Sequence, residues 1–173
     1  MQNRDVHEEQ TDLQDAQEQQ GGGLPDLPAM IKADHELVEG LFIQFEQAGG
    51  NANRQAEVAR QVYQALESHT QLEEQLVYPA ARAEVYEQGD PTVDGFLQAH
   101  QKVTELLNRL QNLSPLDSAF APCFQGLMDS VREHVEEEET TLFPDLYSLP
   151  EAQLEELAEE WEQGKLQHGV PAQ

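Results

Sequence analysis

Four stretches of this chain repeat apolar residues at the three- and four-residue spacing of an amphipathic helix, and each stretch carries one histidine in register with its apolar positions. Side chains at this spacing share one face of a helix, so each histidine is expected to point into the core with its apolar neighbours. Short segments connect the stretches, which favours antiparallel neighbours in an up-down four-helix bundle. The four inward histidines are His35, His69, His100 and His134.

Turn and capping residues bound the four expected helices. Proline is tolerated in the first turn of a helix and bends or ends a helix further along, so its positions mark both starts and stops. The expected helices run from Pro28 to Gly49-Gly50, from the segment after Asn53 to a bend at Pro79, from an N-cap at Asp90 to Ser114-Pro115, and from Phe124 to about Pro144.

Two of the apolar faces also carry a glutamate four residues after the histidine, one turn along the same face. These pairs are His69 with Glu73 and His134 with Glu138. Burying an unpaired carboxylate in an apolar interior costs several kcal/mol, and the four faces contain no Lys or Arg to offset the charge. A bound metal ion is therefore the expected source of positive charge.

The whole pattern repeats after 65 residues. Each half is then one helical hairpin, and two hairpins related by approximate two-fold symmetry create two equivalent metal positions with two glutamates placed to bridge them. Imidazoles and carboxylates without thiolates suit iron, manganese or zinc, and paired sites of this kind are the established pattern of di-iron carboxylate bundles. The repeat maps His35 onto His100, His69 onto His134, Glu73 onto Glu138, and Tyr78-Pro79 onto Phe143-Pro144.

Other polar residues lie near the expected metal positions. Glu39 follows His35 at the spacing of the two bridging candidates, so it is an additional ligand, an acceptor that holds His35, or a solvated residue. Tyr63 and Tyr78 are expected to pack in the core, with a phenolate contact as the alternative. The remaining glutamates lie off the apolar faces and are expected to form a hydrated acidic surface; they are Glu36, Glu74, Glu136, Glu137 and Glu139.

With these motifs the sequence resembles the hemerythrin-like family of HHE cation-binding domains over residues 28–146. The stretches that carry the resemblance are Asp34-His35-Glu36-Leu37-Val38-Glu39, His69 through Tyr78-Pro79, and His134 through Phe143-Pro144. The resemblance implies a four-helix bundle that holds two iron ions with an oxo or hydroxo bridge. It implies His35 and His69 as ligands of one iron, His100 and His134 as ligands of the other, and Glu73 and Glu138 as bridges.

Two positions depart from the oxygen-carrying hemerythrins. Thr104 stands where those proteins have a second histidine four residues after the ligand of the third helix, and Glu139 stands where they have an aspartate. Reversible oxygen transport is therefore in question. An open iron position would permit redox chemistry with oxygen, peroxide or nitric oxide, so we expect a role in oxygen handling or in the oxidative or nitrosative stress response.

Three further functions stay open at this point. Catalase-like degradation of peroxide is the enzymatic alternative for the same di-iron site. The second is iron donation for the repair of iron-sulfur centres, and the third is an acidic helical interaction or iron-sensing module without catalysis.

Composition limits the partners of the chain. Its 34 Asp and Glu residues against 9 Lys and Arg residues give a net charge of -25, which argues against nucleic acid and anionic membrane surfaces. No apolar run approaches the roughly 20 residues of a membrane-spanning helix. The single Cys123 excludes an internal disulfide and favours a reducing, cytoplasmic setting. We expect a small ligand as the partner and a monomer or weak homodimer as the assembly.

The sequence predicts three regions. Residues 1–27 are rich in Gln, Glu and Asp and contain Gly21-Gly22-Gly23, which predicts a disordered acidic arm before the bundle of residues 28–146. Residues 147–173 begin with a capping box, Ser148-Leu149-Pro150-Glu151, and predict an amphipathic C-terminal helix and tail. This helix is expected to pack on the bundle or on a second subunit.

Overall fold

The computed structural model of this chain describes residues 26–167, and every regular element in that range is helical. The acidic arm expected over residues 1–27 lies outside the described residues, except for its last two residues. None of the helices within this range is long and apolar enough to cross a membrane. The elements are α1 (Leu27–Gln47), α2 (Ala52–Leu72), the π-helical turn η1 (Glu73–Val77), α3 (Tyr78–Glu84), α4 (Thr92–Gln111), α5 (Phe120–Leu146) and α6 (Glu151–Gln167).

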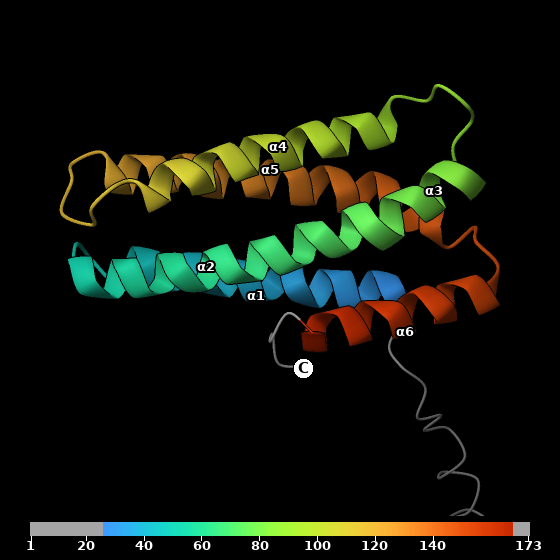
Figure 1. Ribbon diagram of the computed structural model, residues 1–173, viewed down its shortest axis with the longest axis horizontal. Coiled ribbons are helices and arrows are strands. Elements are labelled where there is room, and N and C mark those ends of the chain that lie inside the picture. Colours follow the sequence, from blue (N-terminus) through green and yellow to red (C-terminus); the bar gives the residue numbers. More distant parts are fainter. Residues whose placement is uncertain (1–25, 168–173) are drawn as a thin grey trace, which may run out of the picture.

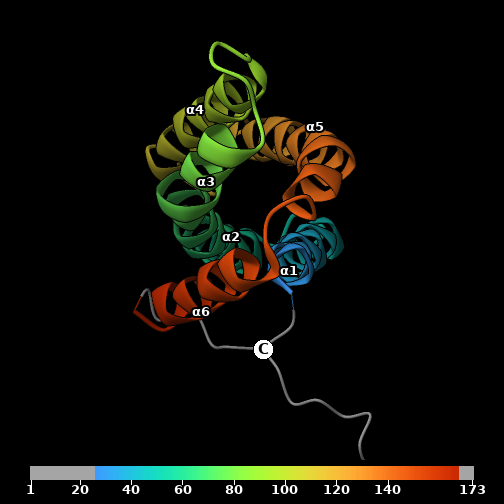
Figure 2. The ribbon, with the colours of Figure 1, turned by 90° about the vertical axis from the view of Figure 1, so that its right-hand side faces the viewer.

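The helices form the expected four-helix bundle with one extra helix. Helices α1 and α2 make one antiparallel pair and α4 and α5 make the other, while η1 and α3 continue α2 (Figure 1). Seen from the end, these elements form a ring, and α6 lies outside it against α1 and α2 (Figure 2). The C-terminal helix therefore covers the bundle of its own chain.

Capping explains most of the helix boundaries. The side chains of Asp26 and Asn51 accept hydrogen bonds from backbone N–H groups in the first turns of α1 and α2. At α4 the expected N-cap is wrong by one residue, because Pro91 occupies it. Asp90 still accepts a hydrogen bond from the N–H of Thr92, at 2.8 Å, so it stabilises the same turn from one residue further out.

Proline has different effects in the two halves of the repeat. The bend expected at Pro79 is replaced by η1, in which the N–H of Tyr78 donates to the carbonyl of Glu73, five residues earlier. Proline lacks an N–H group, so a regular helix would lose a bond here, and the wider π turn accommodates the change. In α5 the helix includes Pro144 and ends two residues later at Leu146, close to the expected end.

The apolar core consists of two clusters of buried side chains. One cluster lies toward the α1–α2 connection and includes Phe42, Phe45 and Phe124. The other lies toward α3 and α6 and includes Tyr78, Phe96, Leu142 and Trp161. On each bundle helix the inward histidine falls between residues of the two clusters, as His35 does between Ile31 and Val38. The histidines therefore form a polar layer with apolar packing on both sides.

Candidate metal centre

All six residues expected to bind metal lie together in this polar layer. Glu73 and Glu138 are completely buried, and each of the four histidines is less than 7% exposed. Their ligand atoms form two adjacent groups, each within a span of 4.8 Å, that could each hold a metal ion. One group contains His35, His69, Glu73 and Glu138, and the other contains Glu73, His100 and His134.

Glu73 belongs to both groups because its two oxygen atoms face different histidines. Its Oε1 lies 3.2 Å from His69 Nε2, and its Oε2 lies 3.2 Å from His100 Nε2. Glu138 also faces both halves, since its Oε2 lies 3.3 Å from His35 Nε2 and 3.8 Å from His134 Nε2. Both carboxylates therefore lie between the two halves of the repeat, as a bridging role requires.

The residues fit metal ions better than they fit one another. Buried polar atoms normally find hydrogen-bond partners, yet several atoms of this layer find none among the described residues. These atoms have the chemistry of metal ligands and face the centre of the group. They include His35 Nε2, Glu73 Oε1 and Glu138 Oε2.

Two glutamates expected on the hydrated surface contact the centre instead. His100 Nδ1 lies 2.9 Å from Glu74 Oε1, and His35 Nδ1 lies 3.0 Å from Glu139 Oε1. A neutral ring that donates from Nδ1 has an unprotonated Nε2 directed toward the centre, which is the state that binds metal. The repeat could have revealed both residues, because Glu74 and Glu139 are themselves 65 residues apart.

Asp34 and Lys165 form a buried ion pair beside His69. Lys165 of α6 donates to Asp34 Oδ2 at 2.7 Å, and the same oxygen lies 3.6 Å from His69 Nδ1. Trp161 of α6 also meets the His69 ring edge to face, with ring centroids 5.8 Å apart. The four apolar faces carry no cation, but the C-terminal helix brings this lysine to the edge of the layer.

Tyr78 reaches the centre, so the expected packing role describes only its ring. Its hydroxyl donates to Glu138 Oε1 at 3.0 Å and lies 3.0 Å from His100 Nε2. Burial raises the pKa of Tyr78, and the charges of Glu73 and Glu138 raise it further, so the phenol keeps its proton. Its counterpart Phe143 stacks against His35 with ring centroids 6.0 Å apart. Tyr63 packs against the first core cluster, as expected, and its hydroxyl donates to Glu67 on the outer side of α2.

Glu39 does not reach the centre. Its two carboxylate oxygens accept hydrogen bonds from Arg132 at 2.7 and 2.9 Å, on the outer side of α1 and α5. Glu39 therefore neither joins the other ligands nor holds His35, and its partly exposed side chain agrees with the solvated alternative. Glu139, from α5, accepts the hydrogen bond of His35 instead.

The pKa values of the buried glutamates and histidines shift in different directions. Burial raises the pKa of Glu73 well above its usual value, and the charge of Glu138 raises it further. Burial also acts to raise the pKa of Glu138, but the neighbouring imidazoles of His35 and His134 outweigh it and lower that pKa to about 2. Burial opposes protonation of His35, yet the carboxylate of Glu138, whose Oε2 lies 3.3 Å from His35 Nε2, raises the pKa of His35 to about 9. The pKa values of His69, His100 and His134 are lowered, chiefly by burial.

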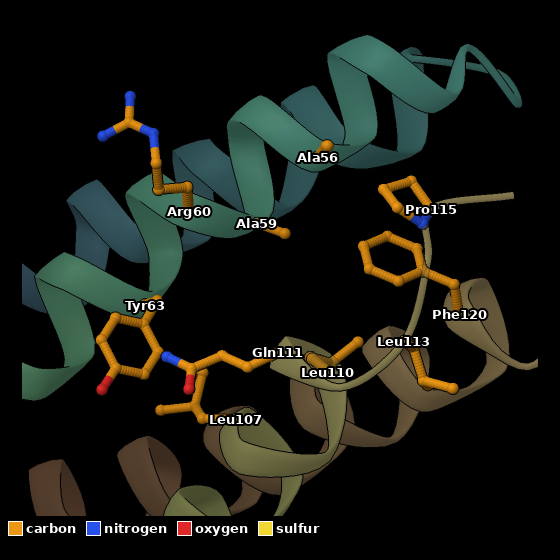
Figure 3. A pocket seen from close by; sticks show the side chains of 10 residues that line it. All are labelled: Ala56, Ala59, Arg60, Tyr63, Leu107, Leu110, Gln111, Leu113, Pro115 and Phe120. Carbon is orange, nitrogen blue, oxygen red and sulfur yellow. The ribbon is translucent and has the colours of Figure 1, made fainter. Parts of the chain in front are cut away.

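A separate cavity lies at the end of the bundle away from α6. It has a volume of about 240 Å³ and a mainly apolar lining, with Tyr63 and Gln111 at one side and the guanidinium of Arg60 directed away (Figure 3). It includes none of the candidate ligands. Its lining comes from α2, α4, α5 and the connection before α5: Ala56, Ala59, Arg60, Tyr63, Leu107, Leu110, Gln111, Leu113, Pro115 and Phe120.

Comparison with known proteins agrees with the fold and with the binding of a cation. The family described as the hemerythrin HHE cation binding domain matches residues 26–146. The crystal structure of a protein containing such a domain, from Mycobacterium kansasii, has a TM-score of 0.73 at 20% identity and covers 84% of this chain and 88% of its own. This similarity supports the fold.

Two curated relatives are longer than this chain. A DNA nickase of Nostoc sp. is 31% identical over 137 residues, which is 79% of this chain and 38% of the relative. An uncharacterized hemerythrin-like protein of Schizosaccharomyces pombe is 34% identical over 74 residues, which is 43% of this chain and 36% of the relative. The matched regions thus span little more than a third of either relative.

Proposed function

Because this chain belongs to the hemerythrin HHE cation-binding domain family, we propose that it is a non-heme di-iron protein that binds or reacts with oxygen, peroxide or nitric oxide. The observation that supports this most is the position of Glu73, which faces His69 with one oxygen and His100 with the other. A carboxylate that is completely buried between two histidine pairs is suited to bridging two cations.

The donor atoms divide naturally between two ions. His35, His69 and Oε1 of Glu73 would hold one, together with Oε2 of Glu138. His100, His134 and Oε2 of Glu73 would hold the other. Iron bound by imidazoles and carboxylates supplies one-electron redox chemistry and an open position for a small ligand.

The surrounding residues orient the ligands and manage protons. Glu74 and Glu139 accept from the Nδ1 atoms of His100 and His35 and so hold each ring with Nε2 directed inward. Tyr78 holds a proton at its hydroxyl and donates it to Glu138 Oε1. The apolar clusters on both sides limit the access of water. A role in oxygen handling or in the oxidative or nitrosative stress response, including catalase-like removal of peroxide, would use these features.

Metal analysis combined with optical titration tests the proposal. The full chain is loaded with ferrous iron without oxygen, its metal content is measured, and spectra are recorded as oxygen, hydrogen peroxide or nitric oxide is added. The two ligand groups predict two iron ions per chain and a spectral change with at least one ligand. Less than one iron per chain after supplementation, or spectra indifferent to all three ligands, would contradict the proposal.

A matched pair of variants tests the ligand set. Glu73→Ala removes the shared carboxylate and should reduce the iron content to one ion or fewer per chain, because both groups lose an oxygen donor. Glu137→Ala removes an exposed glutamate of α5 and should leave the iron content unchanged. Equal iron content in the two variants would rule out Glu73 as a bridge.

The two other candidate functions, iron donation for iron-sulfur repair and an interaction or iron-sensing module, differ in what happens to the iron. Complete burial of Glu73 and Glu138 favours retention of iron over donation, whereas transfer of iron to an apo iron-sulfur protein would support the repair role. Biological activity that survives the loss of metal would support the interaction or sensing module. We do not extend the nickase activity of the Nostoc relative to this chain, because a net charge of -25 repels the DNA backbone.

A further inference from the structure

A groove between α1 and α5 leads from the surface toward the metal centre. It has a volume of about 240 Å³, and its lining includes the buried candidate ligand His35 and its hydrogen-bond partner Glu139. Three valines, here called the valine wall, also line it: Val38, Val131 and Val135. The groove therefore joins solvent to the face of His35 that belongs to the first ligand group.

A small enclosed cavity lies on the other side of the valine wall. Its volume is about 10 Å³, and it is lined by all four candidate histidine ligands together with the valine wall, Leu66, Thr70 and Val103. The lower limit for holding one water molecule is roughly 10–15 Å³, so the cavity is at the limit for a single water molecule and would have to widen to admit a diatomic ligand. The groove and the cavity share His35 and the three valines, so only these side chains separate them.

An ion pair crosses the outer end of the groove. Arg132 of α5 donates to both carboxylate oxygens of Glu39 on α1, and its guanidinium lies 5.7 Å from the centroid of the Phe42 ring. The two charged side chains are 39% and 43% exposed, so water competes with the pair and its net stabilisation is small. Such a pair can open without a large cost in free energy.

The charges around the groove favour neutral molecules. Its lining includes four carboxylates, those of Glu36, Glu39, Glu136 and Glu139, and one cation, that of Arg132. This excess repels anions, while the valine wall offers no hydrogen bond to a hydrated solute. A neutral diatomic molecule meets neither obstacle.

We propose that this groove, with the Arg132–Glu39 pair at its outer end and the valine wall at its inner end, is the access route of a neutral diatomic ligand to the metal centre. The proposal rests on the proposed function and makes it more specific, because it favours oxygen and nitric oxide over anionic ligands. Access then requires only that the valine side chains move aside, as buried side chains do when they change rotamer.

Blocking the valine wall tests the route. Val135→Phe in the ferrous protein should slow the association of nitric oxide, followed by stopped-flow absorbance, by about tenfold or more while the iron content stays the same. Leu106→Phe is the matched control, because Leu106 is also a partly buried residue packed against the same cluster but lines neither space. If Val135→Phe does not fold, Val135→Leu should give a smaller decrease. A rate equal to the control in a folded, iron-loaded variant would overturn the route.

Substitution of the ion pair gives a second test, in which the association rates of two ligands should change in opposite directions. Arg132→Gln should speed the association of nitric oxide, because it opens the pair, and slow that of azide, because it removes the only cation of the lining. Arg82→Gln breaks an exposed pair with Asp94 away from the groove and should change neither rate. Parallel changes for both ligands would contradict the role of charge at this groove.

A measurement without iron separates this inference from the proposed function. In the zinc-loaded protein, xenon should shift the NMR signals of the methyl groups of Val38 and Val131, and Val135→Phe should abolish those shifts. Absence of xenon shifts in the unsubstituted protein would overturn the route even if iron binds as proposed. Conversely, failure to bind iron would refute the proposed function, while the xenon result would still decide whether the passage exists.

Discussion

Glu74 and Glu139 act on the metal centre through the histidines they contact. Each accepts a hydrogen bond from the Nδ1 atom of a histidine in the other half of the repeat, His100 and His35 respectively. This arrangement ties the two hairpins together and sets the ring angle at which Nε2 meets the bridging carboxylates. The two glutamates should therefore affect the affinity for metal more than the number of metal ions bound per chain.

Glu74→Gln and Glu139→Gln should each weaken metal binding by about 10- to 100-fold, because an amide is a poorer acceptor than a carboxylate and the ring loses its orientation. Competition with a chelator of known affinity measures the change, with zinc as the metal to avoid redox reactions. The metal content at saturation should equal that of the unsubstituted chain. Glu137→Gln, at an exposed position of α5, is the control, and an equal loss of affinity in the control would refute the role assigned to Glu74 and Glu139.

Lys165→Met should destabilise the fold by about 3–5 kcal/mol, because it leaves the Asp34 carboxylate buried without its cation. Urea unfolding of the zinc-loaded chain measures the free energy of unfolding. Lys32→Met breaks an exposed pair with Glu139 and should cost about 1 kcal/mol or less. Adding Asp34→Asn to Lys165→Met should recover part of the loss. A loss at Lys165 no larger than that at Lys32 would show that the buried pair does not stabilise α6.

The sequence predicted the members of the metal centre better than their neighbours. Periodicity determines which residues face inward, so His35 and Glu73 could be recognised without coordinates. It says nothing about contacts between helices, and these decide that Glu139 rather than Glu39 holds His35. The sequence did not predict the buried position of Lys165 for the same reason, because α6 packs on the bundle from outside.

At the scale of elements, η1 makes the two halves of the repeat different. The π turn places Tyr78 on the side of Glu73, where its hydroxyl contacts Glu138 and His100. The equivalent Phe143 lies in the uninterrupted helix α5 and packs on His35. The sequence indicates proline in both halves but not how each helix accommodates it, because that depends on the packing around the turn.

Close packing of α6 on α2 depends on Gly164. A methyl group at this position would overlap with the side chain of Leu72, which is buried. Alanine gains about 1 kcal/mol in helix propensity over glycine, whereas overpacking typically costs about 1–3 kcal/mol, so Gly164→Ala should be destabilising overall. Thermal unfolding should show a lower midpoint.

Gly40→Ala is the matched control for Gly164→Ala. Gly40 lies inside α1, and a methyl group there would meet nothing within 4 Å, so only the propensity term applies and the unfolding midpoint should rise. If both substitutions raise the midpoint, α6 is not held closely against α2.

At the scale of the whole molecule, the net charge of -25 has two separate parts. Most carboxylates lie on outer helix faces, where they raise the local concentration of cations and make metal association faster at low ionic strength. Glu73 and Glu138 lie inside, where a metal-free fold must neutralise them with protons or with protonated His35. Metal binding is therefore coupled to proton release.

Metal affinity should increase with pH up to about pH 9. The pKa of His35 is raised to about 9, since the nearby carboxylate of Glu138 outweighs the effect of burial, so below that pH His35 carries a proton that a metal must displace. Each displaced proton makes affinity rise by about tenfold per pH unit, and Glu73, whose pKa is raised chiefly by burial, is a second group whose proton a metal would displace. Calorimetry of zinc binding in buffers of different ionisation enthalpy counts these protons. The number of protons released on metal binding should fall as the pH passes about 9. A metal affinity that does not change between about pH 6 and 8 would show that His35 is not protonated in the metal-free fold.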